Sequence, residues 1–357
     1  MIIFKEHIIF HKNLNILLLV GGLSAERDVS LSSGRAILKA LRENGHEVKV
    51  VDPIFGSEEI SEEKIFQDYI KRDYPTKDSI RLLQKTSSRK MLDCINSKLL
   101  DDIDLVFIGL HGKFGEDGKI QTVLELGGVK YTGSGVISSN LSMDKDFSKV
   151  IMKFNGIKTP DWITFYKGEE ISLNEINNKI NSSFGYPCVI KPNDEGSTVG
   201  LTILYDEDNE KLPAALELAF SYSEKLIIEK YIKGRELTVP VIGTDSYPVI
   251  EIIPKDGFYD YEHKYSKGST DYVCPAEISE PIENEAKQIA VKAHKSLECE
   301  VYSRVDFILN ENNDLYCLEV NTLPGMTDTS LVPKSALKSG INFNQLIEKI
   351  INLSLSK

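Results

Sequence analysis

Two pairs of polar side chains lie in otherwise apolar runs near the C-terminal end of the sequence. Arg304 and Asp306 share one face of the first run, because successive side chains of a strand point to opposite faces. Glu319 and Asn321 share a face of the next run, where they alternate with the apolar Tyr316, Leu318 and Val320. Both runs therefore predict strands with one polar face.

A loop of four residues, 311–314, would join these strands into a hairpin. The expected opposed pairs are Asp306 with Glu319, Arg304 with Asn321, and Asn310 with Leu315. Two carboxylates placed opposite each other are costly unless a cation lies between them. A set of oxygen ligands suits Mg²⁺, which takes its remaining ligands from phosphates and water. The hairpin thus predicts Mg²⁺ with a nucleotide, and a solvated outer sheet face is the alternative.

A lysine ends another expected strand and precedes a loop rich in small and hydroxylic residues. Residues 191–200 read Lys-Pro-Asn-Asp-Glu-Gly-Ser-Thr-Val-Gly. Backbone N–H groups, hydroxyls and the Lys191 ammonium suit phosphate oxygens, although an ordinary hairpin loop is the alternative. Further on, Glu229 and the backbone after it suit an adenine edge, and Glu236 suits ribose hydroxyls.

Two polar residues follow buried strands in the N-terminal half. His111 opens the run His-Gly-Lys-Phe-Gly-Glu-Asp-Gly after the strand 104–110, and Glu26 follows the strand 15–20. Doubly wound sheets bind ligands at the carboxyl ends of their strands, so we expect both residues at one edge. A loop histidine with satisfied hydrogen bonds and a helix-capping carboxylate are the alternatives.

The elements that position these residues predict a mixed fold. Strand, helix and strand over residues 15–51, with the helix over 30–44, open a doubly wound α/β domain, which a strand over 129–132 completes. Neither the G-x-G-x-x-G fingerprint nor a Walker A sequence occurs. Short strands and hairpins after residue 144 predict an α+β half. We expect an N-terminal extension over 1–13, a domain over 14–143 with a charged, partly helical surface insertion over 53–102, and two lobes over 144–235 and 236–357.

The amino-acid composition of the chain limits the classes of function that it can have. The 357 residues include 42 Lys and Arg against 54 Asp and Glu, a net charge of −12 that disfavours general binding to nucleic acid or membranes. No apolar run approaches the ~18–20 residues that span a bilayer, and we expect a cytoplasmic chain. The five cysteines are scattered, which disfavours a disulfide framework or a zinc site.

Taken together, these segments resemble the D-alanine–D-alanine ligase family of ATP-grasp enzymes. The motifs that carry the resemblance are Gly21–Ser30, His111–Gly118, Met143–Lys145, Lys191–Gly200, Glu229–Lys230, Tyr259–Tyr265, Arg304–Asp306 and Glu319–Thr327. The resemblance runs from about residue 15 to the end. It implies a Rossmann-like N-terminal domain followed by a two-lobed ATP-grasp fold. It also implies ATP-dependent joining of two D-alanines through an acyl phosphate, two Mg²⁺ or Mn²⁺ ions, and a homodimer.

The resemblance also implies roles for individual residues. Glu26 meets the amino group of the first D-alanine and is held by Ser197 and Tyr265, while His111 is a substrate-binding residue. The residues for ATP are Lys145, Lys191, Lys264, Glu229, Lys230, Ile232 and Glu236. The metal ligands are Asp306, Glu319 and Asn321, the oxyanion site is Arg304 with the Gly325 N–H, and the second D-alanine meets Ser330 and Leu331.

A closing loop is needed to shield an acyl phosphate from water, and residues 256–274 are the expected lid. This lid would carry Lys264 and Tyr265 into place. Members of the family that prefer D-lactate commonly lose the matching tyrosine, so Tyr265 favours a dipeptide product. Alternatives are a ligase that makes a D-Ala-D-lactate or D-Ala-D-Ser bond, and a nucleotide-binding regulatory protein without catalysis. An oxidoreductase is disfavoured by the missing fingerprint.

Overall fold

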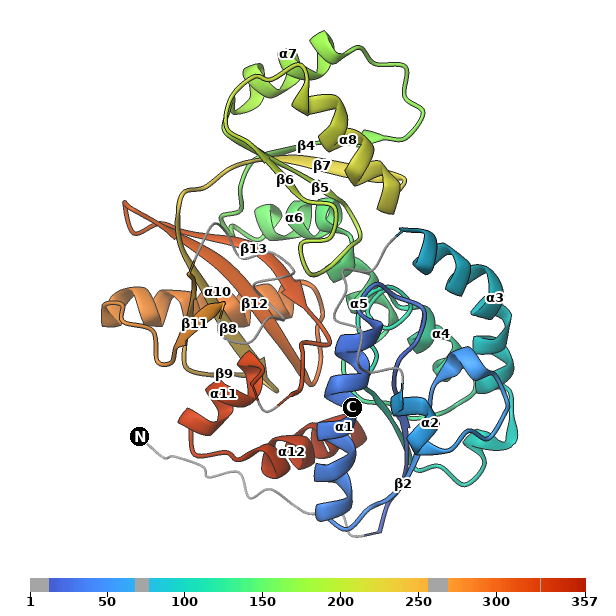
Figure 1. Cartoon of the computed structure of the whole chain (residues 1–357). Helices are drawn as coiled ribbons and strands as arrows, with labels where there is room; N and C mark the ends of the chain where they lie inside the picture. Colours follow the sequence, from blue (N-terminus) through green and yellow to red (C-terminus); the bar gives the residue numbers. More distant parts are fainter. Residues whose placement is uncertain (1–12, 68–76, 256–268, 328) are drawn as a thin grey trace.

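The structure is a computed structural model that describes residues 13–67, 77–255, 269–327 and 329–357. In these residues the chain forms three β-sheets with flanking helices (Figure 1). The first sheet is parallel, in the order β2-β1-β3. Its strands are β1 (Asn15–Leu19), β2 (Glu47–Val51) and β3 (Leu105–Ile108), and its helices include α1 (Arg27–Glu43) and α4 (Lys119–Leu126). Helix α5 (Val136–Met143) follows α4 in the chain. The expected opening of strand, helix and strand is confirmed, with α1 beginning three residues earlier than predicted.

The strand expected over residues 129–132 is wrong. Tyr131 makes a single parallel bridge to Val106, and no longer ladder forms there. The Ile108 N–H donates to the side-chain oxygen of Thr132, at 3.0 Å, instead of to a backbone carbonyl of an added strand. A hydroxyl that takes the place of a backbone acceptor ends the ladder.

The charged stretch over residues 53–102 is helical where it is described. It forms the 3₁₀ turns η1 (Pro53–Phe55) and η3 (Lys98–Leu100) and the helices α2 (Glu62–Gln67) and α3 (Lys77–Ile95). The partly helical character is confirmed. The prediction that this stretch lies wholly on the surface is wrong. Four of its residues are buried in the same hydrophobic cluster as β1, namely Ile65, Phe66, Met91 and Cys94.

The second sheet is antiparallel, in the order β4-β7-β5-β6, and lies at the top of Figure 1. Its strands are β4 (Trp162–Tyr166), β5 (Cys188–Pro192), β6 (Thr202–Leu204) and β7 (Lys225–Lys230). Helices α7 (Leu173–Ser183) and α8 (Lys211–Tyr222) share a separate hydrophobic core with this sheet. Helix α6 (Lys145–Phe154) precedes it in the chain.

The third sheet has six strands, in the order β11-β10-β8-β12-β13, with β9 on β8. They are β8 (Gly234–Ile242), β9 (Asp245–Ser246), β10 (Ile250–Pro254), β11 (Thr270–Val273), β12 (Tyr302–Asn310) and β13 (Leu315–Asn321). Helix α10 (Glu280–Ser296) packs on it. The chain changes sheets between Lys230 and Gly234, beside the expected lobe boundary at 235, although the domain limits stay a prediction. The last part of the expected lid forms β11.

The hairpin register is confirmed at its polar end, where Asp306 faces Glu319 and Arg304 faces Asn321. The pairing of Asn310 with Leu315 is wrong, because Leu315 faces Leu309. A β-bulge shifts the register by one residue after Asp306. The bulge leaves Leu318 without a facing residue and turns Leu315 and Cys317, instead of Tyr316 and Leu318, into the core.

Two C-terminal helices close the fold, α12 (Phe343–Leu355) by packing on the N-terminal unit and α11 (Leu331–Lys338) by packing on α12 and β8. Figure 1 shows α12 beside α1. Four apolar residues of α12 have no exposed surface and join the core around β1, namely Leu346, Ile347, Ile350 and Ile351. A buried contact adds to this packing, since His46 Nε2 lies 3.1 Å from Glu348 Oε2. Among the described helices, none has the length and apolarity needed to cross a bilayer.

Candidate active site

Asp306 is the centre of a hydrogen-bonded group on the polar face of the third sheet. Arg304 donates to it twice, from Nε to Oδ1 at 2.9 Å and from Nη2 to Oδ2 at 2.8 Å. Thr238 Oγ1 on β8 donates to Oδ1 at 2.6 Å, and Asn321 Nδ2 donates to Oδ2 at 3.0 Å. The register of β12 and β13 places Glu319 next to this group. Asp306 is therefore held in one orientation by three neighbours.

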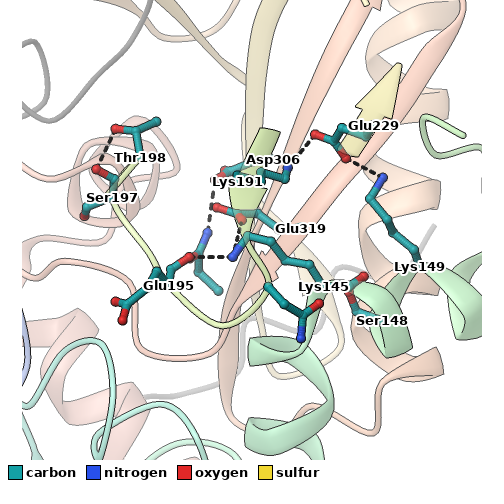
Figure 2. A network of polar contacts seen from close by, with 12 residues as sticks. Lys145, Ser148, Lys149, Lys191, Glu195, Ser197, Thr198, Glu229, Asp306 and Glu319 are labelled. Carbon is teal, nitrogen blue, oxygen red and sulfur yellow. Dashed lines mark hydrogen bonds and ion pairs between the residues drawn. The ribbon is translucent and has the colours of Figure 1, made fainter. Parts of the chain in front are cut away.

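A second set of contacts links this sheet to α6 and to the loop after β5 (Figure 2). Lys145 Nζ lies 3.6 Å from Glu319 Oε2 and donates to the carbonyl of Glu195 at 2.5 Å. Asp144 starts α6, since its side chain accepts from the Phe147 N–H at 2.9 Å, and this cap fixes where Lys145 emerges. Lys145 thus contacts β13 of the third sheet and the loop after β5 of the second sheet at once.

Glu229 near the end of β7 lies between two lysines. Its Oε1 is 2.5 Å from Lys191 Nζ, and its Oε2 is 2.8 Å from Lys149 Nζ. Burial acts to raise the pKa of Glu229, but the two ammonium groups hold this pKa below its usual value. Burial lowers the pKa of Lys149, against the opposing effect of Glu229.

Glu26 at the start of α1 meets the loop after β5. Ser197 Oγ donates a hydrogen bond to Glu26 Oε1. Ser197 and the next residue have left-handed backbone angles, with φ of 51° and 60°, which turn the loop toward α1. A Cβ on Gly112 or on Gly196 would lie 2.8 Å from Glu26 Oε2, so two close backbone approaches enclose this carboxylate.

His111 is buried where the N-terminal unit meets the loop after β13. Its Nδ1 lies 2.8 Å from the carbonyl of Leu323, so Nδ1–H donates, and Nε2 lies 3.0 Å from Ser33 Oγ. Burial lowers the pKa of His111, but the carboxylates of Glu116 and Glu26 raise it above its ordinary value overall. The histidine is satisfied by hydrogen bonds, and it ties the Leu323 loop to the edge of the first sheet.

Lys113 and Glu195 form a further buried pair between the first and second sheets. Lys113 Nζ lies 2.7 Å from Glu195 Oε1 and 3.3 Å from Asp194 Oδ2, and it donates to the carbonyl of Tyr222 at 2.8 Å. Burial raises the pKa of Glu195 to about 7, although Lys113 opposes this shift. The pair ties the loop after β5 to the glycine-rich run that contains Lys113.

The residues expected to meet the second substrate lie at the start of α11. Ser330 Oγ accepts from the Thr327 N–H at 2.9 Å, and a Cβ on Gly325 would lie 3.1 Å from that oxygen. Leu331 is buried against β10 in a small cluster with Ile250 and Ile252. These positions adjoin the loop that His111 holds.

The remaining expected nucleotide residues lie where the chain passes from β7 to β8. Lys230 is exposed, Ile232 is half-buried and Glu236 is half-buried on β8. Lys264 and Tyr265 lie outside the described residues, as does most of the expected lid.

The residues at Asp306 fit a hard divalent cation by their chemistry. Asp306 and Glu319 supply carboxylate oxygens, and the amide oxygen of Asn321 remains after its nitrogen has donated to Asp306. In the described ranges no group of three or more His, Cys, Asp or Glu side chains could hold a metal. A cation here would therefore need ligands from a substrate or water as well.

Three residues of the site were missed by the sequence reasoning, namely Lys149, Lys113 and Thr238. A signal existed for Lys149, because it lies four residues after Lys145 and so on the same side of α6. Lys113 lies within the glycine-rich run after His111. Thr238 has no signal in its own strand, since only the pairing with β12 brings it to Asp306.

The architecture and the site define the class of protein as an ATP-grasp ligase. Solved structures with this fold include the D-alanine–D-alanine ligase of Bacillus anthracis complexed with ATP, at a TM-score of 0.72 and 32% identity over 96% of this chain and 98% of that one. The D-Ala:D-Ser ligase of Enterococcus faecalis has a TM-score of 0.75 and 29% identity over 96% and 100%.

The sequence comparisons specify the family. Models of the D-ala D-ala ligase N-terminus and C-terminus match residues 15–134 and 151–352. The D-alanine–D-alanine ligase of Halalkalibacterium halodurans is 41% identical over 96% of this chain and 100% of its own length. That of Geobacter sulfurreducens is 39% identical over 95% and 94%. The chain belongs to the D-alanine–D-alanine ligase family.

Proposed function

We propose that this protein joins two D-alanines into D-alanyl-D-alanine, with cleavage of ATP, for peptidoglycan precursors. Matches to both family halves support the reaction, and the meeting of three sheets' polar residues supports a site for it. The observation that carries the proposal is the continuous set of contacts from Glu319 through Lys145 to the loop of Ser197 and Glu26. This set brings two carboxylates, a lysine and a hydroxyl into one row of contacts.

In the proposed first step, the carboxylate of one D-alanine attacks the γ-phosphorus of ATP. An O–P bond forms between the carboxylate oxygen and the γ-phosphorus, the bond from γ-phosphorus to the β-phosphate oxygen breaks, and ADP leaves. Lys145, Lys191 and Lys264 bind the phosphates, and Glu229, Lys230, Ile232 and Glu236 bind adenine and ribose. Glu26 and His111 orient the amino acid, with Ser197 and Tyr265 holding Glu26. Bound divalent cations neutralise the facing anions.

In the proposed second step, the amine of the other D-alanine attacks the acyl carbon. A C–N bond forms, the C–O bond to phosphate breaks, and the amine releases a proton as inorganic phosphate leaves. Arg304 and the Gly325 N–H stabilise the oxyanion, because fixed donors cost no reorganisation when charge develops. Ser330 and Leu331 receive the second carboxylate. The lid over 256–274 excludes water.

Two Mg²⁺ or Mn²⁺ ions are proposed at Asp306, Glu319 and Asn321. A Glu319→Gln variant removes one anionic ligand and relieves the repulsion between facing carboxylates, so it should fold normally and turn over far more slowly. Undiminished turnover in folded Glu319→Gln would place the cations elsewhere. Circular dichroism and phosphate release, each with titrated Mg²⁺ and Mn²⁺, make this comparison.

A panel of second substrates tests the reaction itself. We expect phosphate release and a dipeptide by mass spectrometry with ATP and D-alanine, and neither with L-alanine. A D-Ala-D-Ser product is the second candidate, favoured by the likeness to the Enterococcus faecalis enzyme. A D-Ala-D-lactate product is disfavoured by Tyr265. Equal rates with D-serine or D-lactate would contradict the assignment of D-alanyl-D-alanine as the product.

Two further expectations complete the proposal. The homodimer and the cytoplasmic location inferred at the outset remain predictions. Light scattering measures the first and cell fractionation measures the second.

A further inference from the structure

Lys149 has no part in the roles proposed above, yet it lies inside the site. It is on α6, one turn after Lys145, and its side chain has no exposed surface. Its Nζ donates to Thr159 Oγ1 at 2.8 Å and to the carbonyl of Pro160 at 3.1 Å, and it lies 2.8 Å from Glu229 Oε2. The hydroxyl and the carbonyl accept hydrogen bonds from this ammonium, and the Glu229 carboxylate lies beside it as an ion-pair partner.

Glu229 therefore has two counter-ions of different kinds, as Figure 2 shows. Lys149 is held by two further bonds on its own side. Lys191 ends β5 at the loop proposed for ATP phosphates, and its side chain is 10% exposed. Of the two lysines, Lys191 is the one whose ammonium can turn to another anion at small cost.

That movement would be expensive if Glu229 had no second partner. A buried carboxylate without a counter-ion is strongly disfavoured, and breaking a buried pair by removing one member typically costs several kcal/mol. Without Lys149, the movement of Lys191 away from Glu229 would leave this buried carboxylate without a counter-ion. With Lys149 in place, the carboxylate keeps one ammonium at 2.8 Å throughout.

We propose that Lys149 is a positioning residue, the permanent counter-ion of Glu229 that frees Lys191 to bind the ATP phosphates. The inference rests on the proposed nucleotide role of Lys191. It assigns Lys149 to nucleotide binding and not to either amino acid. Loss of Lys149 should therefore hold Lys191 on Glu229 and weaken ATP binding selectively.

The test is Lys149→Met in the full-length chain. We expect the Kd of MgATP, measured by calorimetry without D-alanine, to rise about tenfold or more. The KM for ATP should rise similarly, while the KM for D-alanine changes less than about twofold. A purely structural role would raise both KM values and lower kcat together. Equal effects on ATP and D-alanine would overturn the proposal.

Lys153→Met is the matched control. It makes the same substitution one turn further along α6, where Lys153 is 60% exposed and pairs with Asp161 at 2.7 Å. Exposed pairs of this kind contribute little, so ATP binding should be unchanged. A loss equal to that of Lys149→Met would also overturn the proposal.

A second background keeps the test valid if Lys149→Met alone does not fold. In Glu229→Gln the side chain at position 229 is neutral and needs no counter-ion. The double variant Glu229→Gln with Lys149→Met should therefore fold where Lys149→Met alone does not. Its Kd for MgATP should differ less than about threefold from that of Glu229→Gln alone. The same large loss in both backgrounds would refute the counter-ion role. Because MgATP binding is measured without amino acids, a wild-type protein that binds ATP but forms no dipeptide would refute the proposed function separately.

Discussion

Two carboxylates of the site, Asp306 and Glu229, each contact several side chains from other parts of the chain. Asp306 accepts from Arg304, Thr238 and Asn321, and Glu229 faces two lysines. Arg304 can therefore act either on a developing oxyanion or as a structural partner of Asp306. The two hydrogen bonds from Arg304 to Asp306 support the structural role. A substitution of Arg304 distinguishes the structural role from the catalytic one.

Arg304→Lys should keep ATP binding and thermal stability near those of the wild type but lose most dipeptide formation. Lysine keeps the charge but lacks the guanidinium fork, and loss of one oxyanion donor typically costs about 10²- to 10³-fold in rate. Phosphate release, calorimetry with MgATP and a melting curve measure the three properties. A protein that melts far below the wild type and fails to bind ATP would support the structural alternative instead.

The raised pKa of Glu195 predicts that the stability of the protein depends on pH. This pKa is raised from 4.5 to about 7, so between these values the folded protein binds the proton that the unfolded chain has lost. The free energy of unfolding should therefore fall as pH rises through this window. Relative to Glu195→Gln, the wild type should lose up to roughly 3 kcal/mol between pH 5 and pH 8.

Urea unfolding at several pH values measures this slope. Glu224→Gln is the control, because its carboxylate is 84% exposed beside Lys167 and should leave the slope unchanged. Parallel profiles for the wild type and Glu195→Gln would contradict the prediction. The slope is the relevant quantity, because differences between the two side chains that do not depend on ionisation shift the whole profile without changing its slope, whereas the contact with Lys113 changes as Glu195 ionises.

At the scale of elements, the pairing of β8 with β12 decides whether the Asp306 group assembles. Gly234 faces Asn310 at the start of this pairing. A Cβ on Gly234 would lie 2.2 Å from the carbonyl oxygen of Leu309, which is backbone and cannot rotate away. The two strands approach too closely there for any side chain.

Gly234→Ala should therefore destabilise the protein by about 1–3 kcal/mol, because the strands must separate to admit the methyl group. Gly127→Ala is the control, since its Cβ would meet only atoms at 3.5 Å or more and its φ is −77°. That control should be neutral or slightly stabilising. Equal unfolding free energies for the two variants in urea would show that β8 and β12 adjust freely.

At the scale of the whole molecule, the first and last segments of the chain share one core. Ile350 of α12 is fully buried in the cluster that contains Leu17 of β1. The buried contact between His46 and Glu348 joins the same two regions. The N-terminal sheet should therefore not unfold independently of the C-terminal helices.

Ile350→Ala should lower the free energy of unfolding by about 2–5 kcal/mol, through lost burial and the cavity left behind. Hydrogen exchange of the β1 amides should accelerate by the same free energy, because one core unfolds as a unit. Leu337→Ala, at a side chain 63% exposed on α11, should change little. Unchanged β1 protection in a destabilised Ile350→Ala would show two separate folding units.

The sequence by itself determined the strands of the polar hairpin and the facing of Asp306 with Glu319, because alternation and a short loop are local properties. Its motifs also placed the chain among the ATP-grasp ligases. It could not determine the bulge after Asp306, since the Cys317 N–H leaves β12 to donate to the distant carbonyl of Lys158. Nor could it determine that Glu229 pairs with Lys149 and Lys191, or that Thr238 supports Asp306. Those contacts join segments far apart in the chain, and only the tertiary structure, by burying charges that then require partners, decided which ones form.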